Sequence, residues 1–90
     1  MNAPGTITVL YFAKFREQLG CSQEALPLPA GSSVTVQEVL AMLAARDERH
    51  GELLGCDRGV LMAVNQAMVQ RDRVLQAGDE LALFPPVTGG

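Results

Sequence analysis

The sequence closes on Glu80-Leu81-Ala82-Leu83-Phe84-Pro85-Pro86-Val87-Thr88-Gly89-Gly90, and the fold prediction starts from this stretch. Its first five residues are a largely apolar run of the kind that predicts a strand. Two prolines follow, which fix φ and remove two backbone donors, so the chain can neither extend that strand's ladder nor enter a helix interior. Residues 85–90 are therefore expected to form an extended arm of about 20 Å. The competing expectation is that this end of the chain frays, as many chain ends do.

The two glycines at the end of the arm carry no side chains. The tip therefore offers no packing and a single functional group, the α-carboxylate of Gly90. An arm that is stiff at its proline root and thin at its tip is suited to carrying a carboxylate into the narrow active site of another protein. Whether this arm has that role depends on what the rest of the chain predicts.

Size and composition predict one globular domain that binds neither nucleic acid nor membrane. Ninety residues fall within the range of a single domain. The net charge is −3 and the basic residues are dispersed, whereas nucleic-acid binding needs clustered positive charge. No apolar run approaches the roughly 20 residues that span a bilayer. Residues 1–5 lack the basic start and apolar segment of a signal peptide, so a cytoplasmic location is expected.

The residue types that could carry metal or redox chemistry are Cys21, His50 and Cys56. The sequence around them favours neither a metal site nor a redox site. The cysteines lie far apart, without metal-ligand spacing or a Cys-x-x-Cys pair, so both are expected to be reduced structural thiols. The single histidine lies among charged residues at the end of a helical pattern and is expected to be solvated. No metal site is predicted.

The first part of the chain predicts two strands joined by a short helix. Thr6–Phe12 is β-branched and aromatic, and Ser22–Leu28 alternates in polarity. Between them, Ala13–Leu19 has a helical pattern that ends at Gly20. Alternation along the first strand leaves Phe12 on the outer face and sends the other set of side chains into the core: Ile7, Val9 and Tyr11.

The middle of the chain predicts one main helix of about 12–15 residues. Thr35 and Glu38 have the spacing of a capping box, and an apolar stripe follows them. Arg46–Arg49 is expected to be the solvated end of this helix, and Gly51–Gly59 a connection with at most a short turn.

The last third of the chain predicts further strands. Val60–Asn65 is expected to be a strand with Met62 and Val64 pointing inward, and Asn65-Gln66 turns the chain into a short return segment. The final strand is Glu80–Phe84, in which Leu81 and Leu83 face one way and Ala82 and Phe84 the other.

This order of elements predicts an α+β fold. A mixed sheet of four to five strands with one main helix packed across one face accommodates every apolar stripe, and it is the β-grasp arrangement of ubiquitin-like domains. The first and last strands are then parallel central neighbours. The domain is expected to span residues 1–84, with residues 85–90 as its extended C-terminal arm.

Four segments carry a family resemblance that spans nearly the whole chain, from about Thr6 to Gly90. They are Leu10–Glu17, Ala63–Gln66, Ala77–Glu80 and Phe84–Gly90. Together they resemble the small, sulfur-carrier subunits of molybdopterin synthase. A terminal Gly-Gly alone is shared with ubiquitin and other carriers of this fold, so the specificity of the resemblance rests on the whole closing motif.

The resemblance implies a subunit that donates sulfur and leaves the catalytic groups to a partner. An ATP-dependent, E1-like adenylating enzyme activates Gly90, a sulfurtransferase supplies sulfur, and the glycine becomes a thiocarboxylate, which is anionic and nucleophilic. The large synthase subunit uses that sulfur to build the molybdopterin dithiolene from cyclic pyranopterin monophosphate. The resemblance further implies that this chain itself binds no cofactor and that the assembly is a heterotetramer of two small and two large subunits. The remaining arm residues give Gly90 access to both partners: Pro85, Pro86, Val87, Thr88 and Gly89.

The resemblance also puts the large-subunit interface on the sheet face that points away from the helix. Phe12 and Phe84 share that face on neighbouring strands, Met68 is expected to join them, and Arg16 is a candidate contact at the rim. The alternative is that the three apolar residues are ordinary half-exposed side chains, which are common on surfaces. Arg16 is equally consistent with a solvated charge.

Three other functions stay open on the sequence alone. A sulfur carrier for thiazole or cysteine synthesis would share the Gly-Gly end. A ubiquitin-like protein modifier would be linked through Gly90 to lysines, and the short arm and the lone Lys14 argue weakly against it. A plain β-grasp binding module would have an inert arm.

Overall fold

The computed structural model describes residues 5–28, 34–55 and 59–86. Within these ranges the elements, in chain order, are β1 (Thr6–Tyr11), α1 (Lys14–Leu19), β2 (Gln23–Pro27), β3 (Val34–Thr35), α2 (Val36–Ala44), α3 (Glu48–Leu54), β4 (Leu61–Val64), β5 (Ala67–Met68), β6 (Val74–Leu75) and β7 (Glu80–Phe84).

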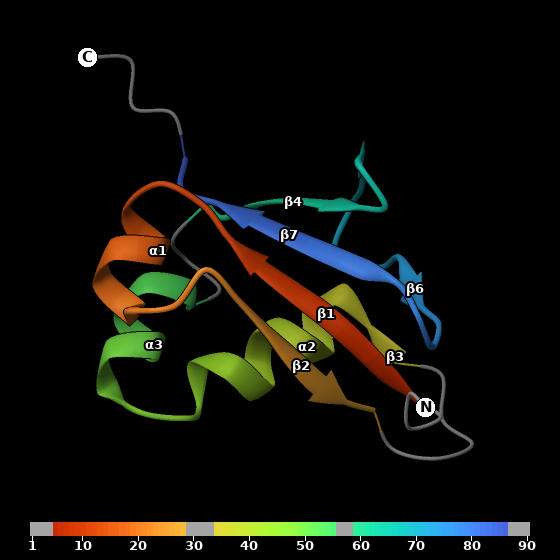
Figure 1. Ribbon diagram of the computed structural model, residues 1–90, viewed down its shortest axis with the longest axis horizontal. Helices are drawn as coiled ribbons and strands as arrows, with labels where there is room; N and C mark the ends of the chain where they lie inside the picture. Colours follow the sequence, from red (N-terminus) through yellow and green to blue (C-terminus); the bar gives the residue numbers. More distant parts are fainter. Residues whose placement is uncertain (1–4, 29–33, 56–58, 87–90) are drawn as a thin grey trace.

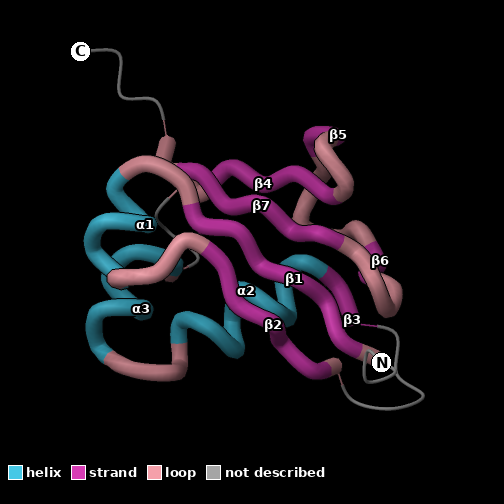
Figure 2. The backbone as a smooth tube through the Cα atoms, viewed as in Figure 1, coloured by secondary structure: helices cyan, strands magenta, loops and turns pink. Residues whose placement is uncertain are grey.

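The main sheet has five strands in the order β2-β1-β7-β4-β5, with β1 and β7 at its centre (Figures 1 and 2). These two central strands are parallel and pair Val9 with Leu81, whereas the other neighbours are antiparallel. A parallel pair needs a long crossover, and here the crossover contains α2. The expected mixed sheet with parallel first and last strands is confirmed. A separate ladder that joins β3 to β6 was not predicted.

The side chains that alternation predicted to point inward from the strands form the core. Ile7, Val9 and Tyr11 of β1 are at most 1% exposed, and Leu81 and Leu83 of β7 are fully buried beside them. The inward residues of β4 are Met62 and Val64, also as expected. Four apolar residues of α2 complete the same cluster: Val36, Val39, Leu40 and Leu43. The predicted packing of a helix against one face of the sheet is therefore confirmed.

The main helix begins as predicted but ends earlier. The Thr35 hydroxyl accepts the Glu38 N–H and the Glu38 carboxylate accepts the Thr35 N–H, which is the predicted capping box. However, α2 has nine residues, so the predicted length of about 12–15 was wrong. The segment expected to be its solvated end instead contains the N-cap of a second helix, because the Asp47 carboxylate accepts the His50 N–H at 2.8 Å.

The helix that Asp47 opens, α3, occupies part of the predicted connection. It ends at Leu54, whose side chain is 1% exposed and belongs to the core. A buried leucine at the end of a short helix holds that helix against the domain, since propensity alone does not stabilise seven residues. The helical layer thus contains α1 and α3 beside α2 (Figure 1).

Tyr11, the only tyrosine of the chain, should titrate far above its usual range. Burial, and then the hydrogen bond its hydroxyl donates to Glu24 Oε2 at 2.6 Å, raise the pKa of Tyr11. A raised pKa in the folded state means that this contribution to stability is full below pH ~10 and is lost as pH rises above it. Absorbance near 295 nm should show no phenolate in the folded protein at pH 10–11, and a midpoint near pH ~10 after denaturation. A folded protein that titrates near pH ~10 would contradict this assignment.

Candidate interface on the outer sheet face

The sheet face opposite α2, called here the outer face, carries two rows of apolar residues that cross neighbouring strands. The register aligns Leu10 with Ala82, Ala82 with Ala63, and Ala63 with Met68, so one row crosses β1, β7, β4 and β5. The second row lies closer to the end of β7 and contains Phe12, Phe84 and Leu61. Because all seven residues lie on strands or directly after β1, the sheet fixes the face as a rigid surface.

The second row is organised by a pair of aromatic rings. Leu61 pairs with Phe84, and the Phe12 N–H donates to the Leu83 carbonyl at 3.2 Å. The rings of Phe12 and Phe84 stack with their centroids 4.7 Å apart and an interplanar angle of 11°. Both rings were predicted to lie on the outer face. Their contact fixes the end of β7, from which the arm leaves.

The outer face exposes more apolar surface than the sequence analysis identified. Met68 is 65% exposed and Phe12 40%, and Leu61, which was not singled out, is 39% exposed between them. The signal for Leu61 was present in the sequence, because inward Met62 and Val64 require an outward residue 61. A contiguous apolar patch on a folded domain is characteristic of an interaction surface.

Arg16 does not belong to either row. It lies on α1 and lines a separate shallow hollow with Gly20 and Cys21. Cys21 is half-buried and free, whereas Cys56 lies outside the described residues. A rim contact from Arg16 stays a prediction.

The arm is described only at its root. β7 ends at Phe84, and Pro85 and Pro86 follow as half-buried residues. Pro86 lies against Gly59, the residue that precedes Val60 and β4. The remaining predicted arm residues, Val87, Thr88, Gly89 and Gly90, lie outside the described residues.

Two of the segments that carry the family resemblance meet at the other end of β7. The Asn65 side chain donates to Asp79 Oδ1 at 3.1 Å and accepts the Glu80 N–H at 3.0 Å. Asp79 also accepts the Gln76 N–H at 2.8 Å. These bonds hold the turn after β4 against the start of β7, and they secure the register that places Phe84 beside Leu61. We assign this cluster a structural role.

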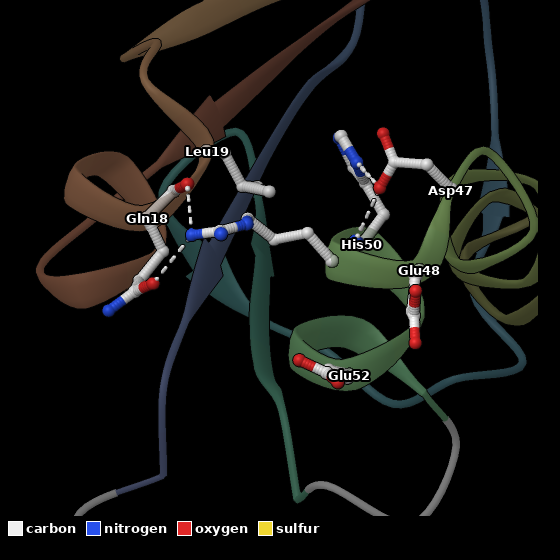
Figure 3. Close-up of a pocket in the computed structure, with 7 residues that line it drawn as sticks. Gln18, Leu19, Asp47, Glu48, His50 and Glu52 are labelled. Atoms are coloured by element: carbon white, nitrogen blue, oxygen red, sulfur yellow. Dashed lines mark hydrogen bonds and ion pairs between the residues drawn. The ribbon is translucent and has the colours of Figure 1, made fainter.

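A hollow of about 460 Å³ lies between α1 and α3, away from the outer face (Figure 3). Arg49 donates to the Gln18 side chain at 3.0 Å, and His50 Nδ1 lies 2.8 Å from Asp47 Oδ1. The His50 backbone N–H, followed by its ring, lowers the pKa of Asp47. His50 was expected to be solvated, but its side chain is only 12% exposed because it packs at the start of α3.

Four polar side chains of this hollow bind one another in two pairs, Arg49 with Gln18 and His50 with Asp47. Among residues 5–28, 34–55 and 59–86, no group of three or more His, Cys, Asp and Glu side chains is placed to hold a metal ion. No helix in the same ranges is long and apolar enough to cross a membrane. The outer face and the arm root therefore form the candidate functional site.

A mixed sheet with a parallel central pair, crossed on one face by α2, defines a β-grasp, ubiquitin-like protein. The model of the ThiS family matches residues 9–90, and the chain belongs to that family together with molybdopterin synthase sulfur carrier subunits.

Individual relatives cover the chain almost completely. The chain is 42% identical to the molybdopterin synthase sulfur carrier subunit of Escherichia coli over 84 residues, covering 93% of this chain and 99% of that protein. It is 35% identical to the subunit of the same name from Homo sapiens, with 93% of each chain covered. In three dimensions it resembles SAMP1 from Haloferax volcanii with a TM-score of 0.76 at 27% identity, covering 96% of this chain and 100% of that one.

Proposed function

We propose that this chain is the sulfur carrier subunit of a molybdopterin synthase. The observation that carries this function is the match to named sulfur carrier subunits along nearly the full length of the chain. The structure supports it, because the exposed apolar outer face lies directly beside the root of the arm. A subunit that supplies only a reactive end needs these two features, a surface that docks on a partner and an arm that reaches into it.

The chemistry that this function requires resides in one group, the carboxylate of Gly90. A carboxylate is a poor electrophile, so a partner enzyme must first adenylate it with ATP. Sulfur supplied at the oxidation level of sulfide then attacks the acyl carbon, the bond to AMP breaks, and Gly90 ends in a thiocarboxylate. Its anionic sulfur attacks a carbon of cyclic pyranopterin monophosphate when the large subunit holds the two together. We propose the large subunit, the adenylating enzyme and a sulfurtransferase as the partners.

The outer face serves as the docking surface for the large subunit in this proposal. Phe12, Leu61, Met68 and Phe84 present an apolar centre, which is the composition of the buried core of an interface. The stacked rings lie nearest to the arm, so a partner that covers them also receives the arm.

Loading of sulfur should be visible in the mass of the chain. Incubation with ATP, the adenylating enzyme and a sulfur source should add about 16 Da at Gly90, the difference between a carboxylic acid and a thiocarboxylic acid. A chain that lacks Gly90 is the matched control and should gain nothing. If the intact chain also gains no mass while the adenylating enzyme consumes ATP on a known carrier, the proposed function is wrong.

A second function is favoured by one observation, the structural likeness to SAMP1, which is named a small archaeal modifier protein in Haloferax volcanii. A modifier would use the same Gly90 carboxylate to form isopeptide bonds with lysines. Adducts of this chain on other proteins would support that function, and recovery of the chain solely as a free thiocarboxylate would exclude it.

A further inference from the structure

We propose that Gly59 is a positioning residue that sets the direction in which the arm leaves the domain. The inference rests on the proposed function, since a direction matters only if Gly90 must reach a partner. It assigns a role in sulfur transfer to a residue distant in sequence from the arm.

The sheet register brings Gly59 to the arm. Leu61 of β4 pairs with Phe84 of β7 in an antiparallel ladder. The same register, continued two residues beyond this pair, places Gly59 opposite Pro86. Gly59 is thus the cross-strand neighbour of Pro86, the second residue of the arm.

The proline ring borders the space that a side chain at position 59 would enter. A β-carbon built on Gly59 would stand 3.5 Å from Pro86 Cβ and 3.8 Å from Cγ, which is ordinary contact. A larger side chain would bring further atoms against the ring and push the arm root outward. Gly59 also has φ 68°, a left-handed conformation that glycine adopts without strain.

Other described glycines do not share this environment. Gly20 and Gly78 also have positive φ, 75° and 91°, but a β-carbon on either would meet nothing within 4 Å. A β-carbon on Gly5 or Gly51 would face a backbone carbonyl, at 3.3 and 3.0 Å. Of these five glycines, Gly59 alone faces the arm.

The contact matters because the arm root lacks the ladder donors that hold β7. Pro85 and Pro86 carry no N–H, so neither residue can donate a ladder hydrogen bond to the segment before β4. Packing of Pro86 on Gly59 therefore helps to hold the root where β7 ends. A small displacement at the root moves the reacting end of the arm further, and misplacement by about 1 Å can slow a reaction by roughly 100-fold.

The test compares Gly59→Asn with Gly78→Asn. Asparagine tolerates the left-handed conformation better than most residues, so both variants should fold. Thiocarboxylate forms made by chemical ligation are then titrated against the large subunit. We expect Gly59→Asn to lower kcat/KM for the carrier about tenfold or more, and Gly78→Asn to change it less than about twofold. Equal kcat/KM values for the two variants, at similar melting temperatures, would overturn the inference.

A second variant shows whether the effect passes through the proline ring. Pro86→Ala keeps Cβ but removes Cγ and the rest of the ring, so in the Gly59→Asn background it should recover part of the lost kcat/KM. If the double variant showed the product of the two single-variant effects, residues 59 and 86 would act independently, and that result would contradict the inference.

A spectroscopic measurement separates this inference from the proposed function. In the free chain, a nuclear Overhauser effect should join Gly59 Hα to Pro86 Hβ, and the Pro86 resonances should shift in Gly59→Asn but not in Gly78→Asn. If the wild-type thiocarboxylate transfers no sulfur, the proposed function fails, while these resonances still report on the contact. Absence of the Overhauser effect would refute the contact itself.

Discussion

Deletion of Gly89 and Gly90 is expected to abolish sulfur transfer and to leave the domain folded. The deletion removes the carboxylate that the proposed chemistry uses, and no other terminal group can take its place at the same position. The core described by the structure ends at Leu83, so the free energy of unfolding should change by less than about 0.5 kcal/mol. Molybdopterin formation with the large subunit and denaturant unfolding measure the two effects separately.

An extension by one alanine after Gly90 tests the same idea without removing any residue. It moves the carboxylate along the arm and adds a β-carbon at the tip, so adenylation and transfer should both fail. The matched control is one alanine added before Met1, which should leave transfer unchanged. Formation of molybdopterin by the extended or the shortened chain would exclude the terminal carboxylate as the sulfur-bearing group.

The parts of the fold that could be predicted from sequence are those encoded by short-range patterns. Alternation in Thr6–Tyr11 predicted which residues of β1 are buried, and the outward position of Phe12 followed from it. Asn65 and Gln66 were predicted to turn the chain, and their φ values of 50° and 73° are those of a tight hairpin. Each of these features depends on residues within about six positions of one another.

The helices were harder to delimit because the signal between α2 and α3 is ambiguous. No glycine or proline interrupts the sequence from Val34 to His50, so the helical pattern could continue. The break comes instead from the Asp47 side chain, which caps the next helix and is indistinguishable in sequence from a solvated helix end. The buried Leu54 then holds α3 in place through tertiary packing, which a local pattern does not contain.

In the candidate site too, local patterns predicted some features, whereas others depend on tertiary structure. The predicted outer-face residues Phe12 and Phe84 required only strand parity and the parallel pairing of β1 with β7. The neighbourhood of Gly59 and Pro86 could not be predicted, because it depends on the exact register of β4 with β7 and on a left-handed backbone conformation. The interface role of Phe12, Met68, Phe84 and Arg16 stays a prediction.

The outer face can be tested with two methionines that differ mainly in where they lie. Met68 is 65% exposed on the outer face, and Met42 is 43% exposed on α2, in the helical layer. We expect Met68→Glu to weaken binding of the large subunit by about 100-fold or more, because an unpaired carboxylate buried at an interface costs several kcal/mol. Met42→Glu should leave the affinity within about threefold of wild type, since glutamate is a good helix former and an exposed position keeps it solvated.

Titration calorimetry with the purified large subunit gives both affinities, and denaturant unfolding shows whether either variant is destabilised. The comparison is informative because both variants add the same charge to a chain whose net charge is already −3. A general electrostatic effect would therefore weaken both, whereas a local one weakens only Met68→Glu. Equal losses of affinity would contradict an interface on the outer face, and a larger loss for Met42→Glu would indicate that the large subunit binds the helices instead. In either case the stacked rings beside the arm would have a role in the fold alone.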